Sequence, residues 1–309
     1  MSIKPQIMAD ELRGFAQKHG IDKIGWFKRA DFPLYLQAIE SREEYGRIKY
    51  RSLEKFRSAA VIPEQFRAVV VMAVNYKMES DYSGKGLKAA NYCRSCWQTL
   101  IPKKEALIGF LHGKALKAEA LDLPARAAAC MAGLGFIGKN TMFYADGIGS
   151  YVGIMAIGID ADLEKSNTGT ERICHRACTN CSKCIDACPT RAIDAKGYAI
   201  NPLKCISMLN RHADEPEIKL PDLPETLDKW LLGCEKCQEV CPLNRRARHK
   251  NKDGVITPEL NVFGMTIPNT AEIPEQLVRK KMSSMQSPGY RKYVAKLLED
   301  KNAKGQEKI

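Results

Sequence analysis

Residues 178–189 read Cys178-Thr179-Asn180-Cys181-Ser182-Lys183-Cys184-Ile185-Asp186-Ala187-Cys188-Pro189, a C-x2-C-x2-C-x3-C-P run. This spacing is typical of chains that hold iron–sulfur clusters, because thiolates are soft ligands suited to iron. The two residues between successive cysteines let their sulfur atoms curl around one cluster. The fourth cysteine of such a run usually binds a second cluster, so the run predicts a partner set of cysteines downstream.

The predicted partner set is present. It consists of the run Cys234-Glu235-Lys236-Cys237-Gln238-Glu239-Val240-Cys241-Pro242, with Cys205 between the two runs. Eight cysteines therefore divide into two sets of four. The first set is Cys178, Cys181, Cys184 and Cys241, and the second set is Cys188, Cys205, Cys234 and Cys237. We expect each set to hold one 4Fe-4S cluster, in a domain like the two-cluster bacterial ferredoxins.

Zinc and disulfides are the alternatives for these cysteines. Zinc also takes four cysteine ligands, and C-x2-C pairs are common in zinc sites. A zinc ribbon, however, has no use for a third cysteine three positions on, nor for a Cys-Pro pair at the end of both runs. Disulfides belong mainly to secreted proteins, whereas the first residues lead straight into an amphipathic pattern without a signal peptide. The preferred interpretation is two 4Fe-4S clusters in a cytoplasmic protein.

The composition sets wider bounds on the protein class. With 309 residues and 45% hydrophobic composition, the chain can bury one large core or two ordinary ones. No apolar run approaches the roughly 18 residues that a membrane span requires, so we expect no membrane partner. The formal net charge of +12 raises the affinity for polyanions such as RNA but carries no specificity.

Hydrophobic patterning predicts an N-terminal α/β region over residues 1–165. Helical patterns cover 9–19, 31–50 and 86–111, and strand patterns cover 21–27, 67–76 and 151–159. Gly20 is the expected stop of the first helix, and a break is expected before Pro102. The continuous apolar run at 67–76 predicts a strand buried on both faces.

A glycine-rich segment, Gly133-Leu134-Gly135-Phe136-Ile137-Gly138-Lys139-Asn140-Thr141, follows a predicted helix that begins near Pro124. It contains G-x-G-x-x-G, but a dinucleotide-binding fingerprint must follow a strand and open a helix. Here a helix precedes the segment and a strand follows it, which disfavours a Rossmann site. Glycines permit a close backbone approach to a ligand, so a loop that lines a cofactor remains the working interpretation.

The predicted domain boundaries follow changes in composition. A polar linker at 166–170 precedes the cysteine-rich domain, which we place at 171–245. A basic run begins at Arg245, and residues 246–309 predict a basic, partly helical extension with a helix at 290–298. The remaining C-x2-C pair, Cys93 and Cys96, lies on a predicted helix and is interpreted as packing residues.

Together these segments resemble the epoxyqueuosine reductases, cobalamin-dependent relatives of the reductive dehalogenases. The glycine-rich segment, the run at 178–189, the motif Lys204-Cys205-Ile206-Ser207 and the segment 233–242 carry the resemblance, which covers roughly residues 10–245. It implies a nitroreductase-like α/β region that holds base-off cobalamin, and two clusters that pass single electrons to cobalt. The implied cofactor-binding residues are Gly133, Gly135, Gly138, Lys139 and Asn140. Lys139 is alternatively an ordinary loop lysine.

The resemblance also implies a reaction and partners. The family reduces an epoxide to an alkene in the last step of tRNA queuosine formation, so tRNA and a low-potential donor such as a ferredoxin or flavodoxin are the implied partners. Reductive opening of a carbon–oxygen bond needs a proton, which a carboxylic acid can supply. An Asp-x-x-Pro element provides it in the family. Here a count back from the glycines places Glu119 at that position, while Asp122 stands nearer to Pro124, so the two are alternatives for one proton donor.

Two further departures concern the substrate. The Tyr-His helix of the tRNA enzyme is replaced by Asn91-Tyr92-Cys93-Arg94-Ser95-Cys96-Trp97. The C-terminal helical repeats that help many members to grip tRNA are not expected in this chain. These departures point to a paralogue that shares the cofactor machinery. The rival hypotheses are a two-cluster ferredoxin-type electron-transfer protein without cobalamin, and a tRNA-binding protein with structural clusters.

Overall fold

The computed structural model describes residues 5–31, 62–78, 82–163, 176–214, 227–246 and 257–305. Two compact units divide the chain. The first comprises Met1–Asn75, Thr99–Gly138 and Met142–Arg176, and the second comprises Tyr76–Gln98, Lys139–Thr141 and Ala177–Ile309. The predicted linker at 166–170 and nearly all of the helix predicted at 31–50 lie outside the described residues. The predicted division into three domains stays a prediction.

The first unit is built on an antiparallel sheet of four strands in the order β1-β2-β7-β4. The strands are β1 (Lys23–Lys28), β2 (Ala68–Asn75), β7 (Val152–Ile159) and β4 (Ala118–Leu121). A separate hairpin pairs β5 (Gly135–Ile137) with β6 (Phe143–Ala145). Mixed helix and strand confirm the predicted α/β (α+β) class.

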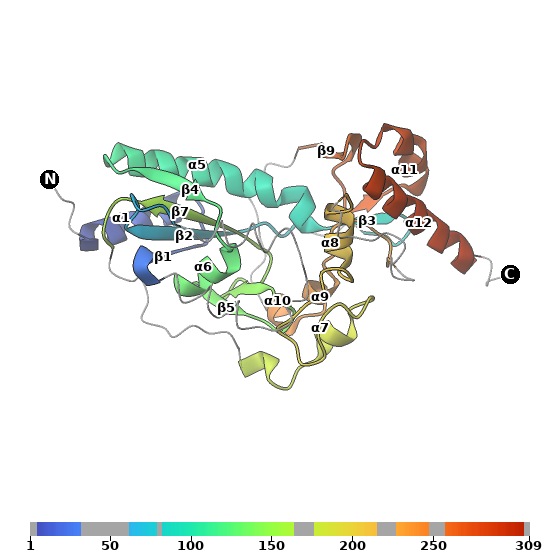
Figure 1. The fold of residues 1–309 in the computed structure, drawn as a ribbon, viewed down its shortest axis with the longest axis horizontal. Helices are drawn as coiled ribbons and strands as arrows, with labels where there is room; N and C mark the ends of the chain where they lie inside the picture. The colour runs from blue at the N-terminus through green and yellow to red at the C-terminus, as the bar shows by residue number, and fades with distance from the viewer. Residues whose placement is uncertain are drawn as a thin grey trace. The chain divides into compact units, whose positions relative to one another are not determined.

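Helices cover both faces of this sheet, as Figure 1 shows for α5 and α6. The helices are α1 (Pro5–Lys18), α5 (Trp97–Gly113) and α6 (Ala125–Met131), and a 3-10 turn, η1 (Arg29–Asp31), follows β1. Alternate residues of β2 enter two separate cores: Val69 and Val71 pack with α6, whereas Val70 and Met72 pack with α1 and α5. All eight residues of β2 are buried, which confirms the predicted strand buried on both faces.

Two glycines end helices in the first unit as the sequence predicts. Gly20 follows α1 with φ 61°, and Gly133 follows α6 with φ 72°. Only glycine adopts this left-handed conformation without steric cost, and it commonly terminates helices. Pro124 stands directly before α6, which confirms the predicted start of that helix.

The prediction of a helix from residue 86 is wrong. Residues Leu87–Ala89 form strand β3, a π-helix η2 (Tyr92–Cys96) follows, and only then does α5 begin. The predicted break before Pro102 is also wrong, because α5 runs through it. Pro102 lies near the start of α5, where the missing N–H costs least, and Leu100 and Leu107 fix the helix in the core.

The second unit contains a three-stranded sheet in the order β11-β3-β8 and a hairpin. The sheet strands are β11 (Glu272–Ile273), β3 and β8 (Trp230–Leu232), and the hairpin joins β9 (Glu259–Val262) to β10 (Met265–Pro268). The longer helices are α8 (Ile206–Arg211), α11 (Glu275–Lys281) and α12 (Pro288–Gly305), and η5 (Met282–Ser284) follows α11. The short elements near the cysteines are η3 (Arg176–Cys178), α7 (Lys183–Asp186), α9 (Lys236–Glu239) and α10 (Pro242–Arg246).

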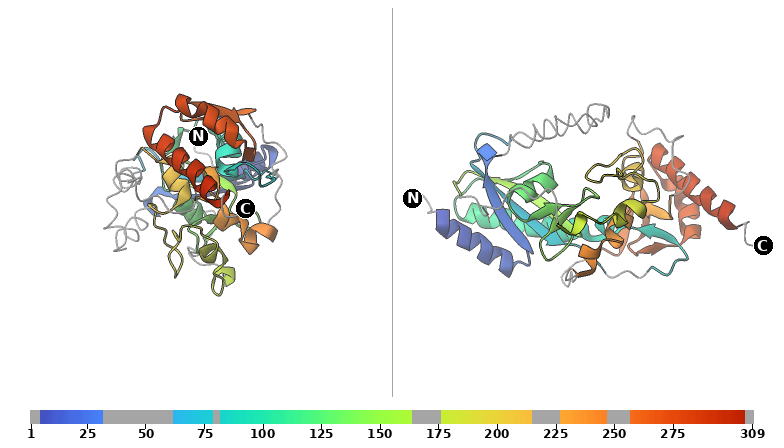
Figure 2. Two further views of the ribbon diagram at one scale, coloured as in Figure 1. Left: turned by 90° about the vertical axis from the view of Figure 1, so that its right-hand side faces the viewer. Right: turned by 90° about the horizontal axis from the view of Figure 1, so that it is seen from below.

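The C-terminal residues are part of the core of the second unit. Helices α11 and α12 (red in Figure 2) complete it, and α12 confirms the predicted helix at 290–298. Tyr290 and Tyr293 are fully buried, and their hydroxyls donate to the carbonyls of Leu231 (2.8 Å) and Trp230 (2.5 Å) in β8. Helix α12 is therefore part of the hydrophobic core of this unit.

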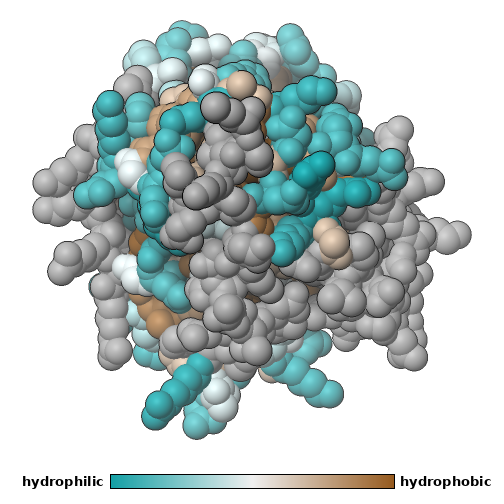
Figure 3. Space-filling model, turned by 90° about the vertical axis from the view of Figure 1, so that its left-hand side faces the viewer, coloured by the Kyte–Doolittle hydropathy of each residue, from teal (hydrophilic) through white to brown (hydrophobic). Residues whose placement is uncertain are grey.

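On the face shown in Figure 3, hydrophilic side chains predominate among the coloured residues, with small apolar areas between them. Within the described part of the chain, no helix combines the length and the apolar composition needed to cross a bilayer.

Candidate iron–sulfur centre

The two cysteine runs fold into two similar local structures in the second unit. Each run forms a short helix. Helix α7 contains Cys184, the third of four cysteines in the first run, and α9 contains Cys237, the second of three in the second run. Helices α7 and α9 pack against each other. Proline after the last cysteine of the second run begins α10, where a missing N–H costs nothing. The repeated spacing in the sequence therefore produces two short helices that pack together, each carrying a cysteine.

The first predicted set of cysteines is gathered in the structure. Burial raises the pKa of the Cys184 thiol to about 11, and the nearby thiols of Cys241, Cys178 and Cys181 contribute to this rise. A thiolate raises the pKa of another thiol only when the two are close, because like charges disfavour ionisation. Cys241 is separated from the other three by more than 50 residues in the sequence, yet its charge raises the pKa of Cys184 more than that of Cys178 or Cys181 does.

The second predicted set is gathered as well. Burial raises the pKa of Cys237, and Cys205, Cys184 and Cys188 raise it further. Burial also raises the pKa of Cys234; a backbone hydrogen bond from Lys236 opposes the rise, and Cys237 and Cys205 add to it. Because the charge of Cys184, in the first set, also raises the pKa of Cys237, the two sets are neighbours.

The donor chemistry of these sets fits 4Fe-4S clusters. The cysteines in the described residues are free thiols. In the same residues, no three His, Cys, Asp or Glu side chains converge as ligands of one metal ion would. Each iron of a cubane cluster takes its own thiolate, so four cysteines surround a larger group. Bound iron would deprotonate the thiols against the effect of burial.

Lys139 and Asn140, from the predicted glycine-rich segment, contact both cysteine loops. The Lys139 Nζ donates to the carbonyls of Thr179 and Cys181, each at 3.1 Å. Asn140 is 1% exposed, and its Nδ2 donates to the carbonyl of Cys237 at 3.3 Å. A side-chain hydrogen bond from Asn140 also opposes the rise in the pKa of the Cys237 thiol that burial causes. The predicted contacts of these two residues with cobalamin stay predictions.

The three predicted glycines belong to the first unit and have local structural roles. Gly133 ends α6, and the N–H of Gly138 donates to the carbonyl of Met142 at 2.9 Å. A Cβ at Gly135 would lie 1.9 Å from the carbonyl oxygen of Tyr144, so only glycine fits this hairpin. The segment leads from a helix into a hairpin and lacks the strand–loop–helix context of a dinucleotide site. A role for these glycines beside cobalamin stays a prediction.

The two candidate proton donors lie on the surface of the first unit. Glu119 is exposed on the edge strand β4, opposite Gly158 of β7. Asp122 is exposed on the turn between β4 and α6. The identity of the proton donor stays a prediction.

A buried carboxylate beside the second cysteine loop is a feature that the sequence did not reveal. Glu235 is 3% exposed and accepts hydrogen bonds from the Nδ2 of Asn91 (2.9 Å) and the N–H of Tyr92 (3.0 Å). Burial raises the pKa of this carboxyl, and the hydrogen bonds from Asn91 and Tyr92 oppose the rise. Glu235 thus ties the start of η2 to the loop between Cys234 and Cys237.

The C-x2-C pair on η2 lies beside the same loop. A Cβ built on Gly233, which has φ 69°, would lie 3.1 Å from the Sγ of Cys93. Desolvation raises the pKa values of Cys93 and Cys96 to about 12, so both thiols stay protonated at neutral pH. The Arg211 guanidinium lies 4.8 Å from the ring centroid of Tyr92, in a cation–π contact next to this pair.

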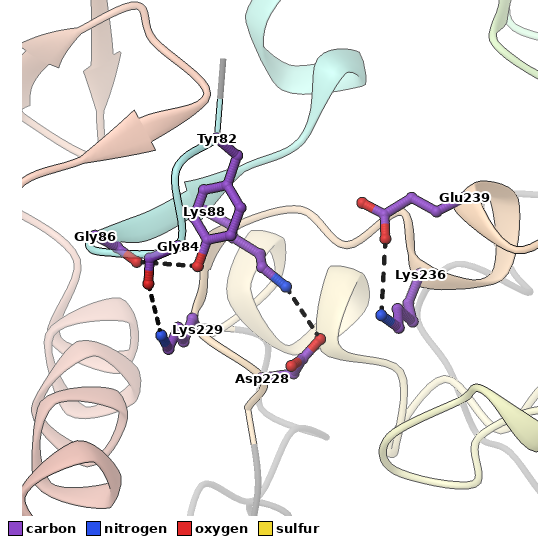
Figure 4. A network of polar contacts seen from close by, with 8 residues as sticks. All are labelled: Tyr82, Gly84, Gly86, Lys88, Asp228, Lys229, Lys236 and Glu239. Carbon is purple, nitrogen blue, oxygen red and sulfur yellow. Dashed lines mark hydrogen bonds and ion pairs between the residues drawn. The ribbon is translucent and has the colours of Figure 1, made fainter. Parts of the chain in front are cut away.

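A polar network fixes the chain that leads into Cys234 (Figure 4). The Nζ of Lys88 lies 5.3 Å from the ring centroid of Tyr82 and 5.0 Å from that of Trp230. It also pairs with Asp228 at 3.4 Å. The Lys229 Nζ donates to the carbonyl of Gly84 at 2.9 Å. These contacts bind the segment 227–232 to β3 and so position the second cysteine loop.

Residues 177–244 match the family described as a 4Fe-4S double cluster binding domain. This match confirms the predicted pair of 4Fe-4S clusters and covers both cysteine runs and Cys205. The assignment of individual cysteines to each cluster stays a prediction.

Curated relatives extend the similarity beyond the cluster domain. An epoxyqueuosine reductase of Cyclobacterium marinum is 30% identical over 227 residues, which are 69% of this chain and 70% of that protein. The epoxyqueuosine reductase of Bacillus subtilis is 28% identical over 271 residues, which are 82% of this chain and 66% of that protein. A solved epoxyqueuosine reductase, bound to an epoxyqueuosine-modified tRNA-Tyr stem loop, has a TM-score of 0.70 at 23% identity and covers 97% of this chain and 84% of its own.

Proposed function

Because the chain belongs to the epoxyqueuosine reductase family, we propose that it passes single electrons through two 4Fe-4S clusters to a base-off cobalamin for reductive chemistry. The observation that carries this proposal is the gathering of two cysteine sets around the packed helices α7 and α9. Two neighbouring clusters can relay single electrons to a further cofactor.

In the proposed arrangement, the first set of cysteines (Cys178, Cys181, Cys184 and Cys241) holds cluster 1, and the second set (Cys188, Cys205, Cys234 and Cys237) holds cluster 2. The nearness of Cys184 to Cys237 supports a short path for electrons between the clusters. Each 4Fe-4S cluster transfers one electron at a time, so a low-potential one-electron donor such as a ferredoxin or flavodoxin fits upstream.

Cobalamin would supply the reducing cobalt centre. Family membership supports its presence, and the family resemblance implies that the segment with Gly133, Gly135, Gly138, Lys139 and Asn140 would bind it. This chain's own contribution to the reaction would be a proton from Glu119 or Asp122, the two alternatives for the donor. Both carboxylates are solvent-exposed, so either one can exchange its proton with water between turnovers.

An epoxide in tRNA is the proposed substrate. One relative was solved with an epoxyqueuosine-modified stem loop, and the net charge of +12 favours a polyanion. The absence of the Tyr-His pair at residues 91–97 leaves room for a different epoxide or a related carbon–oxygen bond.

The test starts with protein purified without oxygen and rebuilt with iron and sulfide. We expect about eight irons per chain from two 4Fe-4S clusters, bound cobalamin after incubation, and cobalt bands in the visible spectrum that change on reduction. Turnover is then assayed on a stem loop that carries epoxyqueuosine. Clusters without cobalamin binding would contradict the proposal and favour a ferredoxin-type electron-transfer protein. Stem-loop binding that falls with salt and ignores cluster redox state would favour structural clusters.

A further inference from the structure

The three residues Lys139, Asn140 and Thr141 are fixed within the second unit, although the chain on both sides of them belongs to the first. The N–H of Tyr198 donates to the carbonyl of Lys139 at 2.8 Å. A Cβ at Gly197 would lie 2.6 Å from the Lys139 side chain, so the lysine stem packs directly on that glycine. The segment is therefore held by the backbone between the two cysteine runs, and its side chains have defined positions.

Lys139 places a positive charge on the loop of the first run. Its ammonium donates to the carbonyl of Cys181, the second cysteine of that run, and to the carbonyl of Thr179, two residues before it. Both carbonyls belong to the loop that would hold cluster 1. Reduction adds a negative charge to a cluster, and a nearby positive charge stabilises the reduced form.

Asn140 places a hydrogen-bond donor on the second run. Its side chain is 1% exposed and donates to the carbonyl of Cys237 at 3.3 Å. A buried donor held on a ligand loop offsets part of the negative charge that reduction adds, and so stabilises the reduced cluster. Cys237 belongs to the set that would hold cluster 2.

Resting on the proposed two-cluster function, we propose that Lys139 and Asn140 set the reduction potentials of the two clusters separately. Lys139 raises the potential of cluster 1, and Asn140 raises that of cluster 2. Two adjacent residues thereby fix the difference in potential between the clusters, which decides how electrons distribute along the relay. Both are positioning residues, since they act through the ligand loops.

Four variants of the rebuilt, cluster-loaded protein test this inference. Lys139→Met removes the charge, and Lys139→Arg keeps it. Asn140→Leu removes the donor, and Asn140→Asp replaces it by a carboxylate of the same shape. The matched control is Lys196→Met, because Lys196 is an exposed lysine of the same charge, next to Gly197. The readout is the pair of midpoint potentials from a redox titration followed by electron paramagnetic resonance, without cobalamin or substrate.

We expect Lys139→Met to lower one midpoint and Asn140→Leu to lower the other. Each reduction equilibrium should fall roughly tenfold, which is about 59 mV for a one-electron couple. Asn140→Asp should lower the same midpoint as Asn140→Leu, and further, whereas Lys139→Arg and Lys196→Met should leave both midpoints in place.

The inference is overturned if both midpoint potentials stay unshifted in Lys139→Met and Asn140→Leu. It is also overturned if the two variants shift the same midpoint potential. If Asn140→Leu loses iron, Asn140→Asp decides the question, since it preserves the shape of the side chain. Failure of the proposed function looks different: the unmodified protein would then bind no clusters, or would bind clusters but no cobalamin.

Discussion

Individual side chains around the second cysteine loop show how strongly burial changes thiol chemistry. Cys93 and Cys96 lie beside the predicted cluster ligands, and burial raises their pKa values as it raises those of Cys184, Cys234 and Cys237. Desolvation is the largest cause of their raised pKa values, and the Arg211 guanidinium only partly offsets it. The folded protein therefore favours neutral thiols at these positions. Cys93 packs beside Gly233, and as neutral thiols both residues are poor nucleophiles at neutral pH.

Alkylation tests this protonation state. A rise in pKa from 9.0 to about 12 lowers the thiolate population of Cys93 and Cys96 roughly a thousandfold at pH 8. We expect iodoacetamide to label both residues far more slowly in the folded protein than in urea, as measured by peptide mass spectrometry. Because the folded pKa values are raised, the two thiols contribute stability that is present below pH 9 and is lost as the pH rises towards 12. Equal labelling rates in the folded and unfolded chain would refute this expectation.

Gly233 offers a second test at this scale. Its φ of 69° and a Cβ only 2.6 Å from the Cβ of Ala90 make Gly233→Ala unfavourable in both backbone and packing. Gly84 is the matched control, because it has φ 92° and open space around it. We expect a cost of about 1 kcal/mol for Gly84→Ala and about 2–3 kcal/mol for Gly233→Ala. Thermal unfolding and iron content measure the difference, and similar midpoints for the two variants would show that Cys93 and Ala90 move aside freely.

Secondary-structure elements were predictable where a short window of sequence contains the cause. The strand β2 is apolar throughout because helices cover both of its faces, and α1 and α6 carry their own stop glycines. In contrast, β3 has only three residues. Its partners lie about 140 and 185 residues away, in β8 and β11. No local periodicity could reveal pairing at that distance, so the sequence predicted a helix there.

One carboxylate anchors the turn before β3, and its pH dependence can be predicted. Glu272 of β11 accepts hydrogen bonds from the N–H and Oγ of Ser83 and from the N–H groups of Gly84 and Gly86. Desolvation raises the pKa of Glu272, but the hydrogen bonds outweigh it, so the net pKa is lowered from 4.5. The anchor is therefore present above pH 4.5 and is lost as the pH falls below it.

Amide exchange of Gly84 and Gly86 measures this anchor. We expect faster exchange at acidic pH, after correction for the intrinsic pH dependence, and similarly fast exchange at neutral pH in Glu272→Ala. Lys229→Ala is a useful comparison, because it removes a bond to the same turn, at the carbonyl of Gly84, without removing a carboxylate. Unchanged protection in Glu272→Ala would show that the backbone alone holds the turn.

At the scale of the whole molecule, the two units interleave along the chain. The sequence suggested consecutive domains because composition changes at 166–170 and after Pro242. Each compact unit is made of segments that alternate along the chain, and three residues of the glycine-rich segment belong to the unit with the cysteine runs. The eight cluster cysteines were predictable, since spacing alone encodes their chemistry. The burial of Glu235 was not, because its partners Asn91 and Tyr92 lie more than 140 residues away.

Removal of α12 tests the interdependence of the second unit. A chain that ends at residue 285 loses Tyr290, Tyr293, Val294, Leu297 and Leu298, all buried in the core with β8. Deletion of even one such large side chain typically costs about 3–5 kcal/mol. We therefore expect the truncated chain to retain little iron and to be soluble at much lower yield. The comparison is Tyr293→Phe, which keeps the ring and loses the hydrogen bond to the carbonyl of Trp230 and the one from the Asn210 Nδ2, and should cost about 1–2 kcal/mol. Normal iron content in the truncated chain would contradict the role of α12.

The late position of α12 has a consequence for how the protein is made. Strand β3 is synthesised before both cysteine runs, whereas its neighbour β11 and the tyrosines that support β8 follow them. A nascent chain therefore exposes eight reactive sulfurs before their scaffold exists. Stable iron insertion therefore has to follow synthesis of α12, which completes the core around β8.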